Sequence, residues 1–488
     1  MTDSVRHQIR DRYSALMRTS QTPDVAALEL SAAHGEMGKL LLAAGCFEAA
    51  EPYFRHAQAL APTDYRWPYY LGHLFKIGGA FQQSAESFEQ VLTLKVDDVT
   101  TLLRLGDLYL AEGRLDLAEP LFGKTLALQP RSVAALFGLG RAALAKQDYA
   151  AAVRHFEQSL QADPRAAAVH YPLAIAYREL GDQTKAELHL RQRREANVPV
   201  PDPLLRELDD LLQSPAAYES RGIRALDTGD WTAAAAHFRK GLELAPADPS
   251  LGHRLGTALF MMGDAQAALQ QFERVLSESP GFARAHYSLG VLMETSGRPA
   301  EAIQRFSGAV RYEPTYIEAR LRLASVLGRT GHLRDALAQY EQVLDIDPRI
   351  AGAQYGRALA LVRLRRYQEA RGALSEGMKT YADQPSFALA LARVLAAAPD
   401  DRIRDGRGAM AVVQGLPAEQ RAADSGETMA MIFAELGQYD EAEAWQRRAI
   451  DGAKRAGRND VAARMIENLR LYESGRPCRT PWREDEMP

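Results

Sequence analysis

The residues of this chain whose types suit acid–base or metal chemistry are eleven histidines and two cysteines in 488 residues. The cysteines, Cys46 and Cys478, lie 432 residues apart, which provides neither a disulfide framework nor the short spacing of a metal site. Neither His-Glu-x-x-His nor Cys-x-x-Cys occurs, although these spacings would place metal ligands together on one helix face or turn. The sequence therefore predicts no metal, no cofactor and no catalytic residue.

Six of the histidines fall at only two positions of a repeating pattern. Three share one position and three share the other: His34, His170 and His286, then His155, His189 and His237. Residues placed in this way occupy equivalent environments about one repeat apart, so we expect them to belong to the scaffold and not to surround one ion.

Two glycine-containing stretches have the composition of phosphate-binding loops. Residues 138–143 fit a dinucleotide fingerprint, which is meaningful only between a strand and a helix. Gly123-Lys124-Thr125 matches the end of a phosphate loop, but Ala118 stands where the first glycine is required. Both stretches lie inside predicted helices, and we reject both as nucleotide sites.

One register of 34 residues organises most of the chain. A small residue recurs at one position: Gly38, Gly72, Gly106, Gly140, Ala174, Gly222, Gly256, Gly290, Ala324 and Ala358. A large apolar residue follows each of these after 16 positions: Phe54, Phe88, Phe122, Phe156, Leu190, Phe238, Phe272, Phe306, Tyr340 and Leu374. Alanine holds a third position in most repeats, and a proline closes most of them.

These residues resemble the tetratricopeptide repeat. The small residue lets two helices approach closely at their crossing, and the large residue fills the space beneath it. A glycine between the two helices accepts the left-handed conformation at a helix end, and the closing proline separates one repeat from the next. The turn glycines are Gly45, Gly79, Gly113, Gly181, Gly229, Gly263, Gly297 and Gly331.

The resemblance implies an all-α fold, a right-handed α-solenoid (superhelix) of helix-turn-helix repeats with terminal capping helices. About 26 helices and no sheet are expected. The expected parts are an N-terminal capping helix (1–30), five regular repeats (31–200), a proline-rich break with a short helix (201–214), five regular repeats (215–384), two divergent repeats (385–456), and a C-terminal capping helix with an irregular tail (457–488).

Two segments outside the regular repeats leave alternatives open. The break contains Leu204, Leu208, Leu211 and Leu212, whose need for burial favours a packed kink over a hinge. The tail residues 477–482 are either disordered or anchored by Trp482 in a pocket. The last helix, residues 460–472, is expected to expose Asn468.

In this family the first helix of each pair lines the concave face, which by resemblance assigns a set of groove positions. They hold eleven basic residues: Lys39, Arg66, Lys76, Arg104, Arg141, Arg178, Arg254, Arg284, Arg322, Arg329 and Arg363. They hold seven acidic residues: Glu36, Asp107, Glu179, Glu219, Asp227, Glu294 and Glu318. The predicted partner-binding residues are Tyr69, Tyr70, Arg104, Phe137, Arg141, Tyr171, Arg178, Arg254, Tyr287, Arg322 and Tyr355.

A basic, aromatic groove suits an extended acidic peptide, because arginine binds a carboxylate through two parallel hydrogen bonds and tyrosine gives contact area at low entropy cost. We predict a non-catalytic scaffold or adaptor for protein–protein interaction. One alternative is a chaperone-like holder in an export or cofactor-insertion assembly. Another is an enzyme with a site in the irregular residues 385–425, which requires a deep pocket with converging His, Asp or Arg side chains.

Composition limits the setting of the protein. The formal net charge of −4 gives no case for nucleic-acid binding, which depends on neutralising phosphates. The first residues are charged and lack the apolar stretch of a signal peptide, and no run approaches the roughly 18 apolar residues of a membrane span. We expect a bacterial, cytoplasmic protein, or a periplasmic one if the true start lies upstream and encodes a leader. The oligomeric state is not predicted.

Overall fold

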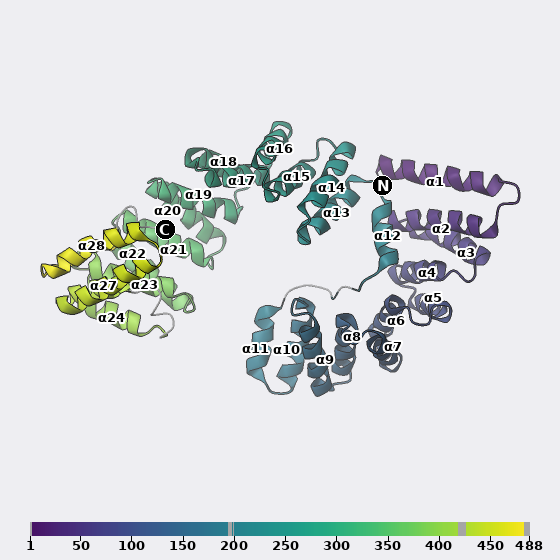
Figure 1. Cartoon of the computed structure of the whole chain (residues 1–488), viewed down its shortest axis with the longest axis horizontal. Helices are drawn as coiled ribbons and strands as arrows, with labels where there is room; N and C mark the ends of the chain where they lie inside the picture. Colours follow the sequence, from purple (N-terminus) through teal and green to yellow (C-terminus); the bar gives the residue numbers. More distant parts are fainter. Residues whose placement is uncertain (1, 194–197, 199, 418–425, 483–488) are drawn as a thin grey trace. The chain divides into compact units, whose positions relative to one another are not determined.

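The computed structural model describes residues 2–193, 198, 200–417 and 426–482. Within these residues it contains 27 α-helices and one short 3-10 helix, and no strand (Figure 1). The predicted all-α fold is therefore confirmed, with a helix count close to the expected one.

The chain divides into two compact units, of which unit 1 holds residues 1–221 with 243–245 and unit 2 holds residues 222–242 and 246–488. The helices of unit 1 are α1 (Asp3–Gln21), α2 (Ala27–Ala43), α3 (Phe47–Leu60), α4 (Arg66–Ile77), α5 (Phe81–Leu94), α6 (Val99–Ala111), α7 (Leu115–Leu128), α8 (Val133–Ala145), α9 (Tyr149–Ala162), η1 (Ala167–Val169), α10 (His170–Glu179), α11 (Gln183–Gln192) and α12 (Pro203–Leu211).

Helix α13 (Pro215–Asp227) crosses the boundary between the two units. The helices after it are α14 (Trp231–Leu244), α15 (Pro249–Met261), α16 (Ala265–Glu278), α17 (Ala283–Thr295), α18 (Pro299–Tyr312), α19 (Ile317–Arg329), α20 (Leu333–Ile346), α21 (Ala351–Arg363), α22 (Tyr367–Thr380), α23 (Pro385–Ala397), α24 (Gly406–Gln414), α26 (Gly426–Glu435), α27 (Tyr439–Arg455) and α28 (Asn459–Glu473).

The helices pack in pairs, and the small residue at each crossing is required by the ring beside it. A Cβ atom added to Gly256 of α15 would lie 2.5 Å from Cε1 of Phe272 in α16, closer than any carbon contact allows. Phe272 is itself only 2% exposed. The same relation holds for Gly38, Gly72, Gly106, Gly140, Gly222 and Gly290, each against the aromatic ring of its own repeat. The 34-residue spacing of small and aromatic residues in the sequence therefore marks the places where the paired helices cross.

The turn between the paired helices has one backbone geometry throughout. All eight predicted turn glycines have φ between 70° and 85°, which is the left-handed region that favours glycine. Two repeats lack the glycine, and there Gln147 (φ 62°) and Arg365 (φ 59°) take the same conformation. The stacking of the repeats therefore imposes this turn even on residues that disfavour it.

The ends of the chain close the two units. Helix α1 packs on α2 and buries Val5 and Leu16. At the other end α28 packs on α27, and Ala462 and Tyr472 are buried. Asn468, expected to be exposed, is instead buried because its side-chain amide donates a 3.2 Å hydrogen bond to the carboxylate of Glu427. Among the helices described, none combines the length and apolar character needed to cross a membrane.

Candidate functional site

The first helices of the repeats form a surface that we call the first-helix face. In unit 1 it consists of α2, α4, α6, α8 and α10, and in unit 2 of α15, α17, α19, α21 and α23. Several neighbouring first helices touch, as α6 touches α8 in unit 1 and α19 touches α21 in unit 2.

Two aromatic residues at the centre of this face in unit 1 are completely covered. Tyr69 is 1% exposed and Tyr70 is 0% exposed, although both occupy positions predicted to meet a partner. The residues that cover them belong to the proline-rich break and to α12, which lies beside α2 (Figure 1). The chain's own insertion therefore occupies part of the predicted groove.

Asp202 makes the first of two matched carboxylate contacts on this face. It accepts one hydrogen bond from Arg104 at 3.0 Å and another from the phenol of Tyr69 at 2.5 Å. Burial, followed by the charge of Asp202, raises the pKa of Tyr69, so the phenol stays protonated and donates. The other oxygen of Asp202 caps α12 by accepting from the backbone N–H of Leu205 at 3.1 Å.

Glu207 makes the second contact, one helix further along. It pairs with Lys39 of α2, whose side chain is 2% exposed, and accepts a 3.2 Å hydrogen bond from Tyr70. Burial, the largest single influence, would raise the pKa of Glu207, but the hydrogen bond and charge of Lys39, the hydrogen bond from Tyr70 and the charge of Arg66 together outweigh it, and the pKa is lowered. Asp202 and Glu207 thus each meet one cation and one phenol.

The leucines of α12 supply an apolar contact between these two polar ones. Leu208 is buried, and Leu204, Leu205 and Leu211 pack against the apolar core formed by repeats one to three. The amphipathic pattern in the sequence correctly indicated that these leucines need burial. It gave no indication of where, because a helix face fits any apolar surface of suitable shape.

This arrangement corrects the picture of unit 1 as an open groove. Tyr69, Tyr70 and Arg104 contact the chain's own acidic segment in place of a separate partner. Further along the face, Arg141 is half-buried, pairs with Asp107 at 3.4 Å and lies 5.7 Å from the ring of Phe137. On α10 the side chains of Tyr171 and Arg178 are exposed; Tyr171 is 52% exposed, and Arg178 pairs with Glu179.

On the first-helix face of unit 2, two arginines share one carboxylate. Glu294 of α17 is 14% exposed and pairs with two arginines of α19, Arg322 at 3.5 Å and Arg329. Both arginines are half-exposed at 51%. Tyr287 lies in an aromatic cluster, with its ring centroid 5.8 Å from that of Phe306 and 5.2 Å from that of Tyr316.

Arg254 and Tyr355, the remaining predicted residues, lie on α15 and α21 of this face. Arg254 on α15 is half-buried. Close by, burial and then Arg284 and Arg254 lower the pKa of His253 to about 4, so this histidine is neutral at pH 7. Tyr355 packs edge-on against Phe387, with centroids 5.3 Å apart, and is half-buried.

The C-terminal tail is anchored as far as the structure describes it. Arg393 of α23 donates to the carbonyl of Pro481, lies 5.1 Å from the ring of Trp482 and pairs with Glu427 at 2.8 Å. Cys478 is buried beside Tyr472. Of the two alternatives for residues 477–482, the structure shows the anchored one.

The irregular residues 385–425 were the proposed place for an enzyme site, and their stretch 418–425 lies outside the described residues. An open depression borders this region, where Arg366 pairs with Glu369 at 2.6 Å and Asp400 pairs with Arg402 at 3.0 Å. These four charged groups pair with each other, and no histidine follows His332 in the sequence. Within the described part of the chain, no three His, Cys, Asp or Glu side chains gather as a metal site.

One pair of histidines departs from the expected scaffold placement. His170 and His189, from the two different repeat positions, meet with their Nδ1 atoms 2.9 Å apart. The ring of Tyr177 stacks on His189 at 5.8 Å. The pair arises within one repeat because those two positions face each other across the helix pair, which a one-dimensional register does not show.

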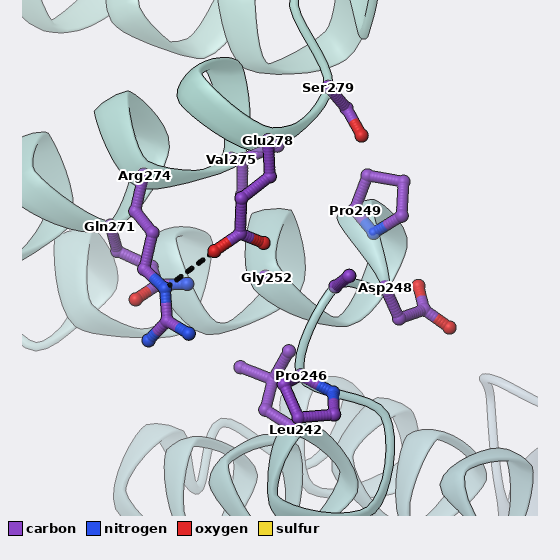
Figure 2. A pocket seen from close by; sticks show the side chains of 11 residues that line it. Leu242, Pro246, Asp248, Pro249, Gly252, Gln271, Arg274, Val275, Glu278 and Ser279 are labelled. Carbon is purple, nitrogen blue, oxygen red and sulfur yellow. Dashed lines mark hydrogen bonds and ion pairs between the residues drawn. The ribbon is translucent and has the colours of Figure 1, made fainter.

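A small pocket in unit 2 lies between α14, α15 and α16 (Figure 2). Figure 2 shows Arg274 and Glu278 on its wall, joined by a 3.1 Å ion pair. Its volume of about 10 Å³ holds at most one water molecule, so it is a packing gap and not a ligand site.

Comparison with known proteins agrees with this architecture. Four family models described as "Tetratricopeptide repeat" match residues 97–165, residues 321–385, residues 143–206, 225–292 and 259–321, and residues 423–456. The last match falls on the divergent unit that follows the irregular region. No curated protein sequence matches the chain.

Several solved structures are similar to this chain. Yeast Tom70 is 15% identical over 91% of this chain and 96% of its own, with a TM-score of 0.29. MamA from Desulfovibrio magneticus RS-1 is 20% identical over 35% of this chain and 96% of its own, with a TM-score of 0.32. A tetratricopeptide repeat protein from Parabacteroides merdae is 17% identical over 61% of this chain and 98% of its own, with a TM-score of 0.30. The family models together cover more than half of the residues, and the chain belongs to the tetratricopeptide repeat family.

Proposed function

We propose that this protein is an interaction scaffold whose unit 2 binds an extended acidic peptide across helices α15 to α21. The observation that carries the proposal is the charge of these helices. At the predicted groove positions these helices hold five arginines, Arg254, Arg284, Arg322, Arg329 and Arg363, against two carboxylates, Glu294 and Glu318. A partner that adds carboxylates here relieves this imbalance.

The arrangement of Glu294 supports the same conclusion. One carboxylate is shared between Arg322 and Arg329, so neither guanidinium has a carboxylate to itself. An arginine fork binds a carboxylate best through two parallel hydrogen bonds, and a peptide carboxylate offers this geometry. Tyr287 lies on the neighbouring helix and provides a rigid surface for an apolar residue of the peptide.

The two alternative functions have less support. An enzyme in residues 385–425 requires converging catalytic side chains, and those around the nearby depression pair with each other. A chaperone-like holder requires a broad apolar surface. The charged and aromatic residues of unit 2 favour a specific peptide instead.

Peptide binding by variants of the full chain tests the proposal. The probe is a fluorescein-labelled twelve-residue peptide with the repeated sequence Glu-Ala-Glu-Leu, compared with the same peptide carrying Lys for Glu. We expect the acidic peptide alone to raise fluorescence anisotropy. In the Arg254→Glu/Arg322→Glu variant its Kd should rise at least tenfold, because each reversal replaces attraction by repulsion.

A matched control reverses two arginines on second helices, Arg274→Glu and Arg305→Glu. The control changes net charge equally but leaves the first-helix face intact, so binding should stay within about twofold of wild type. Equal binding by the first variant and wild type, or equal weakening by the control, would remove the basis for this site.

A further inference from the structure

The insertion crosses the first-helix face of unit 1 in a fixed order. Pro201 accepts a 3.0 Å hydrogen bond from Thr100 of α6, Asp202 binds Arg104 of α6 and Tyr69 of α4, and Glu207 binds Tyr70 of α4 and Lys39 of α2. Beyond them, Gln8 of α1 donates to the carbonyl of Leu211 at 3.1 Å and accepts from the N–H of Gln213 at 2.8 Å. The segment therefore runs from the third repeat back to the N-terminal helix, opposite to the order of the repeats.

This segment stands outside the helix pairs that build the solenoid. Helix α12 packs on α2, far away in sequence, and at its C-terminal end Arg221 of α13 donates hydrogen bonds to the carbonyls of Asp209 and Leu212, at 2.7 Å each. The repeats of residues 31–200 are complete without it, because each first helix already has its second helix. A nine-residue helix is not stable alone in water, so docking on the face is what keeps α12 helical.

The contacts have the form of ligand recognition. Two carboxylates five positions apart each meet a cation and a phenol, and leucines between them enter an apolar surface. One of the two cations does not depend on the segment alone, since Lys39 also pairs with Glu36 of its own helix. When α12 leaves the face, Lys39 therefore keeps Glu36 as a counter-ion, and no unpaired charge is left at this position.

We propose that residues 201–212 are an internal ligand of unit 1, and that this face binds an acidic amphipathic helix of a partner protein that replaces them. The partner helix carries an aspartate at its N-cap, a second acidic residue five positions later and leucines on the side between. This site is separate from the peptide site proposed for unit 2, and neither depends on the other.

Covalent attachment sets how strong the competing partner must be. A ligand tethered by a short linker has an effective concentration on the order of millimolar. An external helix with identical contacts therefore cannot displace α12 at micromolar concentration. The partner needs additional contacts, and the exposed Tyr171 and Arg178 on α10 extend the same face beyond the segment.

A release variant tests whether the segment behaves as a ligand. Asp202→Lys with Glu207→Lys in the full chain places two cations against Arg104 and Lys39 and expels the segment. The probe is a fluorescein-labelled peptide with the natural sequence of residues 199–213. We expect no binding of the probe by wild type at a concentration of about 10 µM. The release variant should bind the probe at least tenfold more tightly than wild type does.

Two controls make the result specific. Glu48→Lys with Glu86→Lys changes the charge of unit 1 equally on exposed second-helix positions and should bind no more than wild type. Adding Arg104→Glu to the release variant should abolish peptide binding, because the Asp202 contact is then repulsive. A peptide in which Asn and Gln replace the residues equivalent to Asp202 and Glu207 should bind at least tenfold more weakly.

Each other outcome overturns the proposal. If the release variant loses clearly more helix content by circular dichroism than the nine residues of α12 account for, the segment is part of the core of unit 1 and not a ligand. If it stays folded but does not bind the peptide, the face does not recognise this chemistry. If wild type binds the peptide as tightly as the release variant does, the face is not occupied by the internal segment.

Discussion

Arg104, in the first helix of the third repeat, donates a 3.0 Å hydrogen bond to the carboxylate of Asp202, which lies 98 residues further along the chain. The same carboxylate accepts from Tyr69 and caps helix α12. One side chain thereby fixes the start of the inserted helix and attaches it to two neighbouring repeats. The contact places an acidic group of the chain itself against the first-helix face of unit 1.

Substitution of the glycine at a helix crossing should be strongly destabilising. In Gly256→Leu the new Cβ would meet Phe272 at 2.5 Å, so helices α15 and α16 must separate. We expect a loss of roughly 3 kcal/mol or more in the free energy of unfolding, measured by urea titration followed by circular dichroism. Glu273→Leu on the exposed side of α16 should change it by less than about 0.5 kcal/mol. An unchanged midpoint for Gly256→Leu would show that the crossing tolerates bulk.

At the turn formed by Gln147, substitution by glycine should raise the stability of the folded protein. Its φ of 62° is unfavourable for a residue with a Cβ atom, and its side chain is exposed. We expect Gln147→Gly to stabilise the chain by about 0.5–1 kcal/mol, the relief of strain less the greater flexibility of the unfolded glycine. Gly113→Gln in the preceding repeat, where φ is 74°, should destabilise by about 1 kcal/mol. Thermal melts of both variants check the opposite signs.

Stability should fall on acidification through the buried His253. Its pKa is lowered to about 4 in the folded chain, while the unfolded value is about 6.5. Between pH 4 and pH 6.5 the unfolded chain binds a proton at His253 that the folded chain does not bind. The contribution of neutral His253 to the free energy of unfolding is therefore intact above pH 6.5 and is lost progressively as the pH falls towards 4. The stability advantage of wild type over His253→Gln should therefore shrink by about 2–3 kcal/mol between pH 7 and pH 4. If the difference in free energy of unfolding between wild type and His253→Gln stays constant from pH 7 to pH 4, the pKa of His253 is not lowered in the folded chain.

Neutralising Glu294 should strengthen binding of an acidic peptide to unit 2. Glu294→Gln removes the carboxylate shared by Arg322 and Arg329 and makes both guanidinium groups available to the peptide. We expect the Kd of the Glu-Ala-Glu-Leu peptide to fall about threefold to tenfold, an effect opposite in sign to that of the arginine reversals. Raising the salt concentration from 0.05 M to 0.5 M should weaken binding to both proteins. A weaker complex with Glu294→Gln would place the peptide elsewhere.

The repeat architecture follows from the sequence because its determinants are local. Gly256 and Phe272 are 16 residues apart in a unit that recurs, and each recurrence presents the same steric requirement. The turn conformation was likewise predictable at Gly263. That Gln147 and Arg365 adopt it too is a consequence of stacking, which outweighs the local preference of those residues.

By itself, the sequence of this protein determined the helix pairs, their crossings and the first-helix positions of its arginines and tyrosines. Only the tertiary structure decided that Tyr69, Tyr70 and Arg104 meet Asp202 and Glu207, that Asn468 is buried against Glu427, and that Trp482 lies beside Arg393. The physical reason is that an amphipathic segment or a carboxylate has many energetically acceptable partners, and its sequence says only that it needs one. Which partner it finds depends on surfaces that exist once the repeats have stacked.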